Sequence, residues 1–161
     1  KDPYAMTIAS VTPGKYLVRA RAYLGGYVQS LRCGNADLFR EELVVPESGV
    51  VPPIEVEMRD DAATVNVKVR GDKPGQQAAV LIVPDDEISR EPRIMAADLA
   101  MGVQAIYLAP GAYKVFAFDS IADPDYEEPG TLAKYAGKAA SLTLSPNGTA
   151  SVTVDLIHRG E

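Results

Sequence analysis

The same turn occurs twice in this chain, as TPGKYLV at residues 12–18 and as APGAYKV at residues 109–115. In each copy Pro presets one turn residue, and Gly supplies the positive φ that the next position requires. The Tyr that follows is expected to begin a core strand, to bury its ring at the corner and to reach a backbone group with its hydroxyl. A chain that contains this turn twice is expected to hold two copies of one supersecondary unit.

Alternation of apolar and polar residues is the second strong pattern. Apolar side chains at every other position predict strands with one buried and one solvated face at residues 16–22, 54–59, 65–70 and 152–156. Residues 78–83 are continuously apolar, which predicts a strand buried on both faces. Helix-like composition occurs at residues 92–101 and 123–135, where at most short helical turns are expected. With 13 Gly and 12 Pro along the chain, these patterns predict an all-β fold of short antiparallel strands.

The two copies of the turn are followed, at nearly the same distance, by similar strand-like segments, PPIEVEMR at residues 52–59 and ASVTVDLI at residues 150–157. They differ upstream, because the second copy has residues 62–109 before its turn and the first has only residues 1–12. We therefore expect a complete β-sandwich at residues 61–161. Residues 1–60 are expected to be the C-terminal part of a preceding sandwich, with its missing strands supplied from upstream or by a partner. Half a sandwich would expose strand edges.

Residues 98–115, DLAMGVQAIYLAPGAYKV, resemble the D-x-x-G-x-(F/I)-x-(L)-x-P-G-x-Y-x-V pattern of the carboxypeptidase regulatory-like domains. These are prealbumin-like, Ig-like β-sandwiches related in fold to collagen-adhesin B-type repeats. The segment TVNVKVRGDKPGQQAAVLIVPDD is similar to the first two strands of that family, although Val67 and Lys68 stand where the family usually has Gly. The resemblance covers residues 62–157 well and 4–59 in part. It implies a structural, adhesive or accessory module of an exported bacterial protein, secreted or in the cell envelope.

Composition excludes several classes of partner. The net charge of −6 repels a phosphate backbone, so nucleic acid is not expected as a partner. No apolar run approaches 18 residues, so membrane insertion is not expected either. Cys33 is the single cysteine and is expected to be a packed apolar side chain rather than a nucleophile. We expect no cofactor.

Few residues are candidates for chemistry. His158 is the single histidine, and we expect it to be an exposed residue near the end of a strand rather than a catalytic group. Weak candidates for a Ca²⁺ site are the acidic residues of one loop, Asp123, Asp125, Glu127 and Glu128. A second acidic set comprises Asp85, Asp86 and Glu87; for both sets a solvated loop is the simpler interpretation. The candidates for ligand-facing aromatics are Tyr23, Tyr27, Tyr126 and Tyr135.

Three functional hypotheses follow. The leading one is a non-catalytic structural, adhesive or spacer module, whose partners are other domains of the parent chain or identical copies joined by strand complementation. The second is an accessory carbohydrate- or peptide-binding domain of a secreted enzyme, which requires an exposed aromatic patch. The third is a prealbumin-fold hydrolase, which predicts that His158→Ala abolishes activity.

Overall fold

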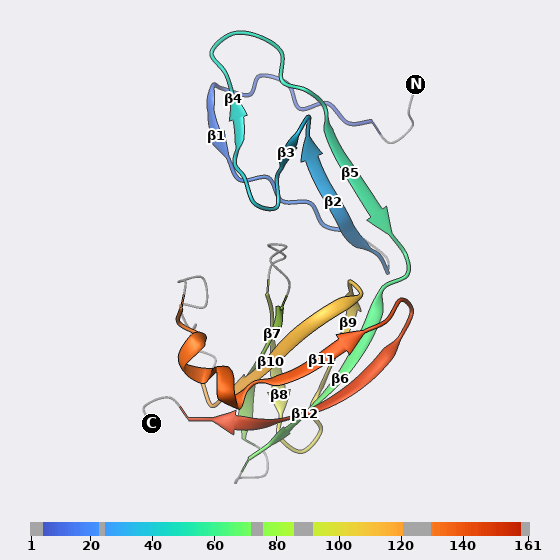
Figure 1. The fold of residues 1–161 in the computed structure, drawn as a ribbon, viewed down its shortest axis with the longest axis vertical. Helices are drawn as coiled ribbons and strands as arrows, with labels where there is room; N and C mark the ends of the chain where they lie inside the picture. The colour runs from blue at the N-terminus through green and yellow to red at the C-terminus, as the bar shows by residue number, and fades with distance from the viewer. Residues whose placement is uncertain (1–4, 23–24, 72–75, 86–91, 121–129, 159–161) are drawn as a thin grey trace.

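In the computed structural model, the described part of the chain is all-β with one short 3₁₀ helix (Figure 1). The structure describes residues 5–22, 25–71, 76–85, 92–120 and 130–158. Its strands fall into two groups, the N-terminal lobe (residues 5–59) and the C-terminal lobe (residues 63–158), and the path between them runs through residues 60–62 (Figure 1). Within the described ranges, every strand pairing lies inside one lobe. The predicted all-β class is confirmed.

The C-terminal lobe is built on one seven-stranded sheet. Its strands are β6 (Ala63–Arg70), β7 (Gln77–Pro84), β8 (Arg93–Asp98), β9 (Val103–Leu108), β10 (Gly111–Phe118), β11 (Ala140–Leu144) and β12 (Thr149–Ile157). The order is β8-β7-β10-β12-β6-β9, and β11 pairs separately with β10. Most pairs are antiparallel, as predicted, but β12 runs parallel to β6 and to the end of β10.

The predicted alternation holds throughout β6. Val65, Val67 and Val69 are buried in the main core, where they pack with Val115 and Val154 from other strands. The continuous apolar run of β7 is buried on both faces, also as predicted. Burying a Val side chain fully contributes about 1.5–3 kcal/mol, so this core dominates the stability of the lobe.

A second, smaller cluster lies on the other face of the sheet. Leu81, Phe116, Phe118 and Ile157 are buried there, and the 3₁₀ helix η1 (Ala133–Lys138) contributes to their cover. Of the segment 123–135 predicted to be helical, residues 123–129 lie outside the described residues. The helical turn does occur in the described remainder, after Gly130.

The prediction of a helical turn at residues 92–101 is wrong. Residues 93–98 form β8, which pairs along its whole length with the edge of β7, from Ile82↔Arg93 to Gln77↔Asp98. Helix propensity is a weak preference of a few tenths of a kcal/mol per residue. A continuous ladder with a buried neighbouring strand outweighs it.

The N-terminal lobe holds two small sheets. β1 (Gly14–Tyr16) pairs with β4 (Leu43–Val45), and β2 (Tyr27–Cys33) lies between β3 (Ala36–Asp37) and β5 (Ile54–Arg59). Their core is a cluster of four buried residues: Val28, Leu31, Cys33 and Leu38. The thiol of Cys33 donates to the carbonyl of Pro52 at 3.3 Å, so this cysteine is a packed side chain, as expected.

Two strand predictions in this lobe need correction. Of the predicted strand 16–22, only Tyr16, the last residue of β1, belongs to a ladder, although Val18, Ala20 and Ala22 do pack against the core while Leu17, Arg19 and Arg21 are exposed. β5 is a strand, but neither of its faces is buried. Alternation reports which side chains prefer burial, and it does not report whether another element covers them.

The repeated turn has the same local structure in both lobes. Gly14↔Val45 and Tyr16↔Leu43 in the first match Gly111↔Leu144 and Tyr113↔Leu142 in the second. Tyr16 donates its hydroxyl to the carbonyl of Thr12, and Tyr113 donates to the carbonyl of Ala109, each at 2.7 Å. The predicted bond from the Tyr hydroxyl to the backbone is confirmed in both copies. The predicted start of a core strand with a buried ring is confirmed only at Tyr113 of β10, because Tyr16 is half-buried and is the last residue of β1.

Candidate functional site

The outstanding surface feature is an uncovered apolar face on β5. β5 pairs antiparallel with β2 in the register Cys33↔Ile54, Leu31↔Val56 and Val28↔Met58. Side chains that lie opposite each other in such a pair share one face of the sheet. The β2 members are all buried, whereas Ile54, Val56 and Met58 are 36%, 44% and 61% exposed. The core-facing side of this sheet therefore extends onto β5, beyond the elements that cover it.

The equivalent strand of the C-terminal lobe is covered. On the sequence repeat, Ile54, Val56 and Met58 of β5 correspond to Val152, Val154 and Leu156 of β12. Val154 is 2% exposed, against 44% for Val56. Val154 packs in the main core, which is formed by residues of β6 to β12, whereas the core cluster of the N-terminal lobe does not include Val56. β5 also has one neighbour, β2, among the described residues. We call Ile54, Val56 and Met58 the open face.

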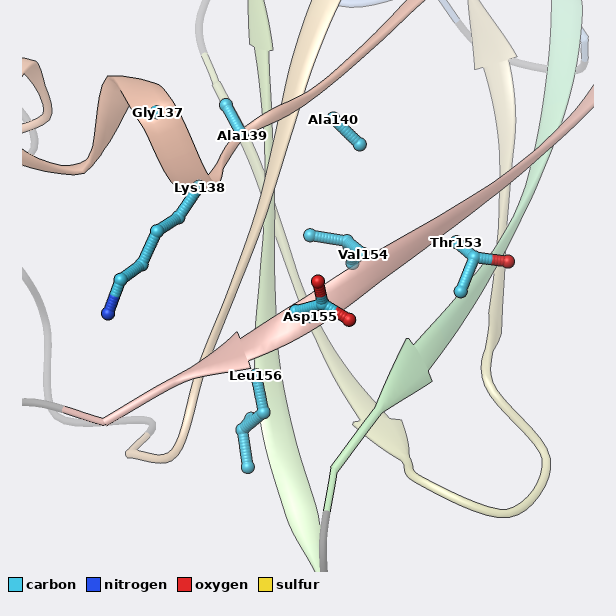
Figure 2. A pocket seen from close by; sticks show the side chains of 8 residues that line it. All are labelled: Gly137, Lys138, Ala139, Ala140, Thr153, Val154, Asp155 and Leu156. Carbon is cyan, nitrogen blue, oxygen red and sulfur yellow. The ribbon is translucent and has the colours of Figure 1, made fainter.

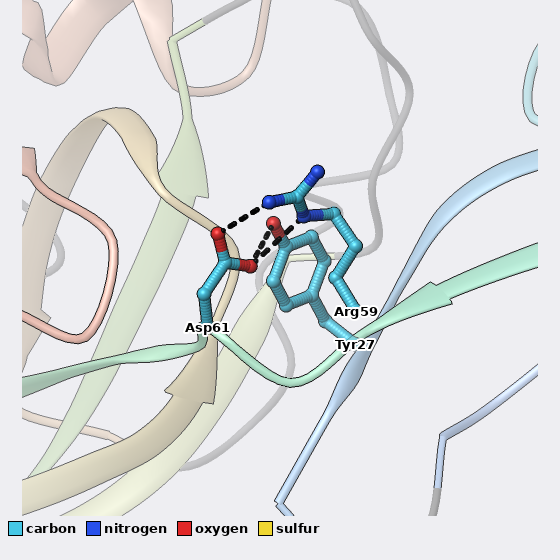
Figure 3. A network of polar contacts seen from close by, with 3 residues as sticks. All are labelled: Tyr27, Arg59 and Asp61. Atoms are coloured by element: carbon cyan, nitrogen blue, oxygen red, sulfur yellow. Dashed lines mark hydrogen bonds and ion pairs between the residues drawn. The ribbon is translucent and has the colours of Figure 1, made fainter.

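A polar network joins the two lobes immediately after β5 (Figure 3). Arg59 donates from Nε and Nη2 to the two carboxylate oxygens of Asp61, at 3.0 and 2.8 Å. Tyr27 of β2 donates its hydroxyl to Oδ1 of the same carboxylate at 3.0 Å. The hydrogen bonds from Arg59 hold the pKa of Asp61 below its ordinary value against the effect of its burial, and the bond from Tyr27 adds to them. The same bidentate pairing raises the pKa of Arg59.

Asp61 is also tied to the C-terminal lobe through its backbone. Its carbonyl accepts a hydrogen bond from the amide of Asn147 at 2.9 Å, in the turn before β12. Gly25 packs against the ring of Tyr107, where an added Cβ would lie 3.4 Å from the ring. The connection between the lobes therefore makes hydrogen bonds to both of them, through the side chain of Asp61 on one side and its backbone carbonyl on the other.

In the part of the chain that the structure describes, the candidates for catalysis do not form a recognisable centre. His158 Nδ1 lies 3.0 Å from Asp119 Oδ2, which makes two members of a triad. Cys33 is buried in the other lobe and hydrogen-bonded to Pro52. Among the described residues, no three His, Cys, Asp or Glu side chains are grouped so that they could hold a metal ion.

The predicted acidic sites are only partly visible. Asp123, Asp125, Glu127 and Glu128, the Ca²⁺ candidates, lie outside the described residues, as do Asp86 and Glu87. Asp85 is described and forms an ion pair with Lys114 at 2.7 Å.

The four candidate aromatics do not form one exposed patch in the described part of the chain. Tyr23 and Tyr126 lie outside it. Tyr27 is buried at the lobe junction, so its ring does not face solvent as a ligand platform would. Tyr135 packs edge-on against Phe118 at 5.2 Å, with Lys134 Nζ 5.0 Å from its ring centroid.

A groove of about 420 Å³ lies between η1 and β12 (Figure 2). It is lined by Gly137, Lys138, Ala139, Ala140, Thr153, Val154, Asp155 and Leu156. Asp155 already forms an exposed ion pair with Arg70 at 3.1 Å. This lining contains no aromatic side chain and no nucleophile paired with a base, so it offers neither a sugar platform nor a catalytic dyad.

No model of a known protein family matches the sequence, and no curated protein is significantly similar to it. None of the helices in the described ranges has the length and apolar character needed to cross a membrane.

Sequence reasoning did not identify the open face or the junction. The apolar residues of β5 were noticed, but as core. The apolar–polar alternation of residues 54–59 is the same as that of residues 152–156, so it carries no signal of an open face. Nothing in the sequence pattern distinguishes Asp61 from other acidic residues between strands.

Proposed function

We propose that this chain is a non-catalytic structural module of an exported bacterial protein. In this proposal it consists of two tandem prealbumin-like sandwich units of the carboxypeptidase regulatory-like type. The first unit is completed by a strand from outside residues 1–161. The partner would be another domain of the parent protein or an identical copy, and the module would act as a spacer or adhesive unit in the cell envelope or outside the cell.

The observation that carries the proposal is the open face of β5. An edge strand with exposed apolar side chains is an aggregation hazard that proteins usually blunt with charge, proline or a covering element. Here the side chains belong to the core side of a sheet, and their equivalents on β12 are covered. A surface that is built as core and left open is most simply explained by a partner that covers it.

The repeated turn supports the tandem arrangement. The same register and the same tyrosine–carbonyl hydrogen bond occur in both lobes. The polar network at Asp61 supports a spacer role, because the bidentate ion pair with Arg59 and the hydrogen bond from Tyr27 restrain the connection between the units. The resemblance of residues 98–115 to the carboxypeptidase regulatory-like pattern belongs to this proposal as well.

The test introduces a lysine into the open face and follows binding of the apolar dye ANS, together with solution mass by light scattering. We expect the wild-type chain to bind ANS and Val56→Lys to lose most of that binding while retaining its β-sheet NMR spectrum. Val50→Lys is the matched control, because Val50 is 91% exposed but lies outside any strand. If identical copies are the partner, mass will rise with concentration in the wild type and Val56→Lys will abolish the rise.

Two outcomes would count against the proposal. If Val56→Lys unfolds the N-terminal lobe, the open face is core in solution. If Val56→Lys and Val50→Lys change ANS binding equally, the face is not a distinct surface. A hydrolytic activity lost in His158→Ala would favour the enzyme hypothesis instead, since His158 and Asp119 are the paired groups available to it.

A further inference from the structure

The edge of β5 that has no described partner can be compared with the paired edge of β12 in the C-terminal lobe. In the C-terminal lobe, β12 holds β6 beside it in parallel, with Val152↔Val67, Val154↔Val69 and Asp155↔Arg70 in register. β5 corresponds to β12 on the repeat, but its one described neighbour, β2, is antiparallel, so no described strand runs parallel to β5 as β6 runs parallel to β12. The position beside this edge of β5 is therefore expected to take a strand of the β6 kind, parallel to β5.

The turn repeat identifies a second neighbour of that position. β9 precedes the turn in the C-terminal lobe and pairs antiparallel with the other edge of β6. Residues 6–11 precede the turn in the N-terminal lobe and have no ladder partner among the described residues. Ser10 and Tyr107, which occupy the same place three residues before Pro13 and Pro110, share a positive φ of 61° and 60°. Met6 and Ile8 of this segment are 86% and 75% exposed.

The charge of β5 selects the chemistry of the incoming strand. Its residues between the open-face positions are Glu55 and Glu57, and Glu57 corresponds to Asp155 of β12. Asp155 is paired with Arg70 of β6 at 3.1 Å, whereas the exposed Glu57 accepts a hydrogen bond from Ser30 on β2 at 3.2 Å. An incoming strand with Lys or Arg at these positions would reproduce the pairing seen in the C-terminal lobe.

The same charges disfavour a second copy of β5 as the occupant. Consider two copies of β5 that pair antiparallel over most of their length with their apolar side chains on one face. Glu55 of one copy then lies opposite Glu57 of the other, or Glu57 lies opposite Glu57 of the other copy. Parallel in-register pairing stacks each Glu on its copy. Like charges directly opposite each other across a ladder are destabilising.

We propose that the edge of β5 binds a strand from another polypeptide, parallel to β5, with small apolar residues at alternate positions and Lys or Arg between them. The inference rests on the proposed function and names its partner. The apolar side chains of the strand lie beside Ile54, Val56 and Met58 on the same face of the sheet, and its basic side chains lie beside Glu55 and Glu57 on the other face. Main-chain hydrogen bonds to the free edge supply affinity, and the alternating side chains supply specificity.

The test uses the full chain and a synthetic peptide with the sequence of residues 62–71, AATVNVKVRG. Its control is the same peptide with both basic residues replaced by Glu. Binding is followed by ¹H–¹⁵N NMR and titration calorimetry. We expect shifts and slowed amide exchange at β5 and residues 6–11, and an affinity about fivefold or more weaker for the acidic peptide. Glu57→Lys should reverse the preference between the peptides, and Val56→Lys should abolish binding of both.

Three results would overturn the inference. The first is equal affinity for both peptides, which would remove the charge argument. The second is a set of shifts confined to β9 and β12, which would mean that the peptide displaces β6 in the C-terminal lobe. The third is self-association blocked by Val56→Lys without peptide binding; that outcome would leave the proposed function standing with a second copy as the partner.

Discussion

The repeated tyrosine permits a test in which one contact is removed in two environments of the same molecule. Tyr113→Phe and Tyr16→Phe each delete one hydroxyl that donates to a carbonyl four residues earlier, over the same 2.7 Å. Tyr113 is 4% exposed, and its acceptor Ala109 is also buried. Tyr16 is half-buried, and its hydroxyl also lies 2.8 Å from the Thr12 hydroxyl at an exposed site. The two variants therefore differ in access to water and hardly in geometry.

The burial sets the expected magnitudes. In Tyr113→Phe the carbonyl of Ala109 loses this donor where water cannot easily replace it, which costs about 2 kcal/mol, within the roughly 1–3 kcal/mol seen for buried polar groups left unpaired. In Tyr16→Phe water can take the place of the hydroxyl, and the cost should be about 0.5 kcal/mol or less. For a lobe of this size the first figure corresponds to a fall in Tm of roughly 10 °C.

The measurement must report the two lobes separately, because they need not unfold together. The chain has eight Tyr and no Trp, so intrinsic fluorescence would mix the two signals. Urea unfolding followed by ¹H–¹⁵N NMR gives each lobe its own midpoint and slope, and an unchanged slope identifies a true change in stability. We expect the Tyr113 variant to move the midpoint of the C-terminal lobe alone. Equal losses from the two variants, or a loss below about 0.5 kcal/mol for Tyr113→Phe, would refute the reasoning from burial.

Three further predictions follow from contacts of single residues. Val154→Ala should destabilise the C-terminal lobe by about 2 kcal/mol or more, because it leaves a cavity in the core. Val56→Ala leaves no cavity and should destabilise the N-terminal lobe by about 1 kcal/mol or less. Urea unfolding measures both, and similar losses for the two variants would contradict the exposure of the open face. Gly102→Ala should lower the stability by about 3 kcal/mol or more, because a Cβ at its φ of +73° would overlap the carbonyl oxygen of Val67. Gly49 has a φ of +115° but open space around it, so Gly49→Ala should cost about 1 kcal/mol. Comparable losses in urea unfolding would show that the cost comes from backbone strain alone and not from the overlap with Val67. Because the pKa of Asp61 is lowered, its hydrogen bonds with Arg59 and Tyr27 stabilise the fold fully above the ordinary pKa of 3.8, and this stabilisation disappears as the pH falls through the lowered pKa. The side-chain NMR signals of Arg59 should change over that pH interval. Asp61→Asn should remove this pH dependence.

Much of the local structure could be predicted from the sequence. The two Pro-Gly-x-Tyr turns formed as expected because their geometry depends on residues within a few positions of one another. The in-and-out pattern of β6 and the doubly buried β7 also followed from side-chain order. In the N-terminal lobe the alternation at Val18, Ala20 and Ala22 survives even where no ladder forms. Short-range chemistry was enough for each of these.

The candidate site depended on contacts between distant segments. Tyr27 was expected to face a ligand, but it is buried and bonded to Asp61, because β2 begins beside the point where the connection leaves β5. Residues 93–98 form a strand because they pair with the edge of β7 along their whole length. Neither result could be obtained from the residues of one segment, since the competing local preferences differ by only a few tenths of a kcal/mol per residue.

β5 and β12 separate the two kinds of information most clearly. The sequence alone determined that both strands present apolar side chains at alternate positions, because that order is a property of the strand itself. Only the tertiary structure decided that Val154 is buried and Val56 is not. Burial requires other elements to pack on the same face: Val154 lies in the core formed by β6 to β12, and the core cluster of the N-terminal lobe does not extend over Val56.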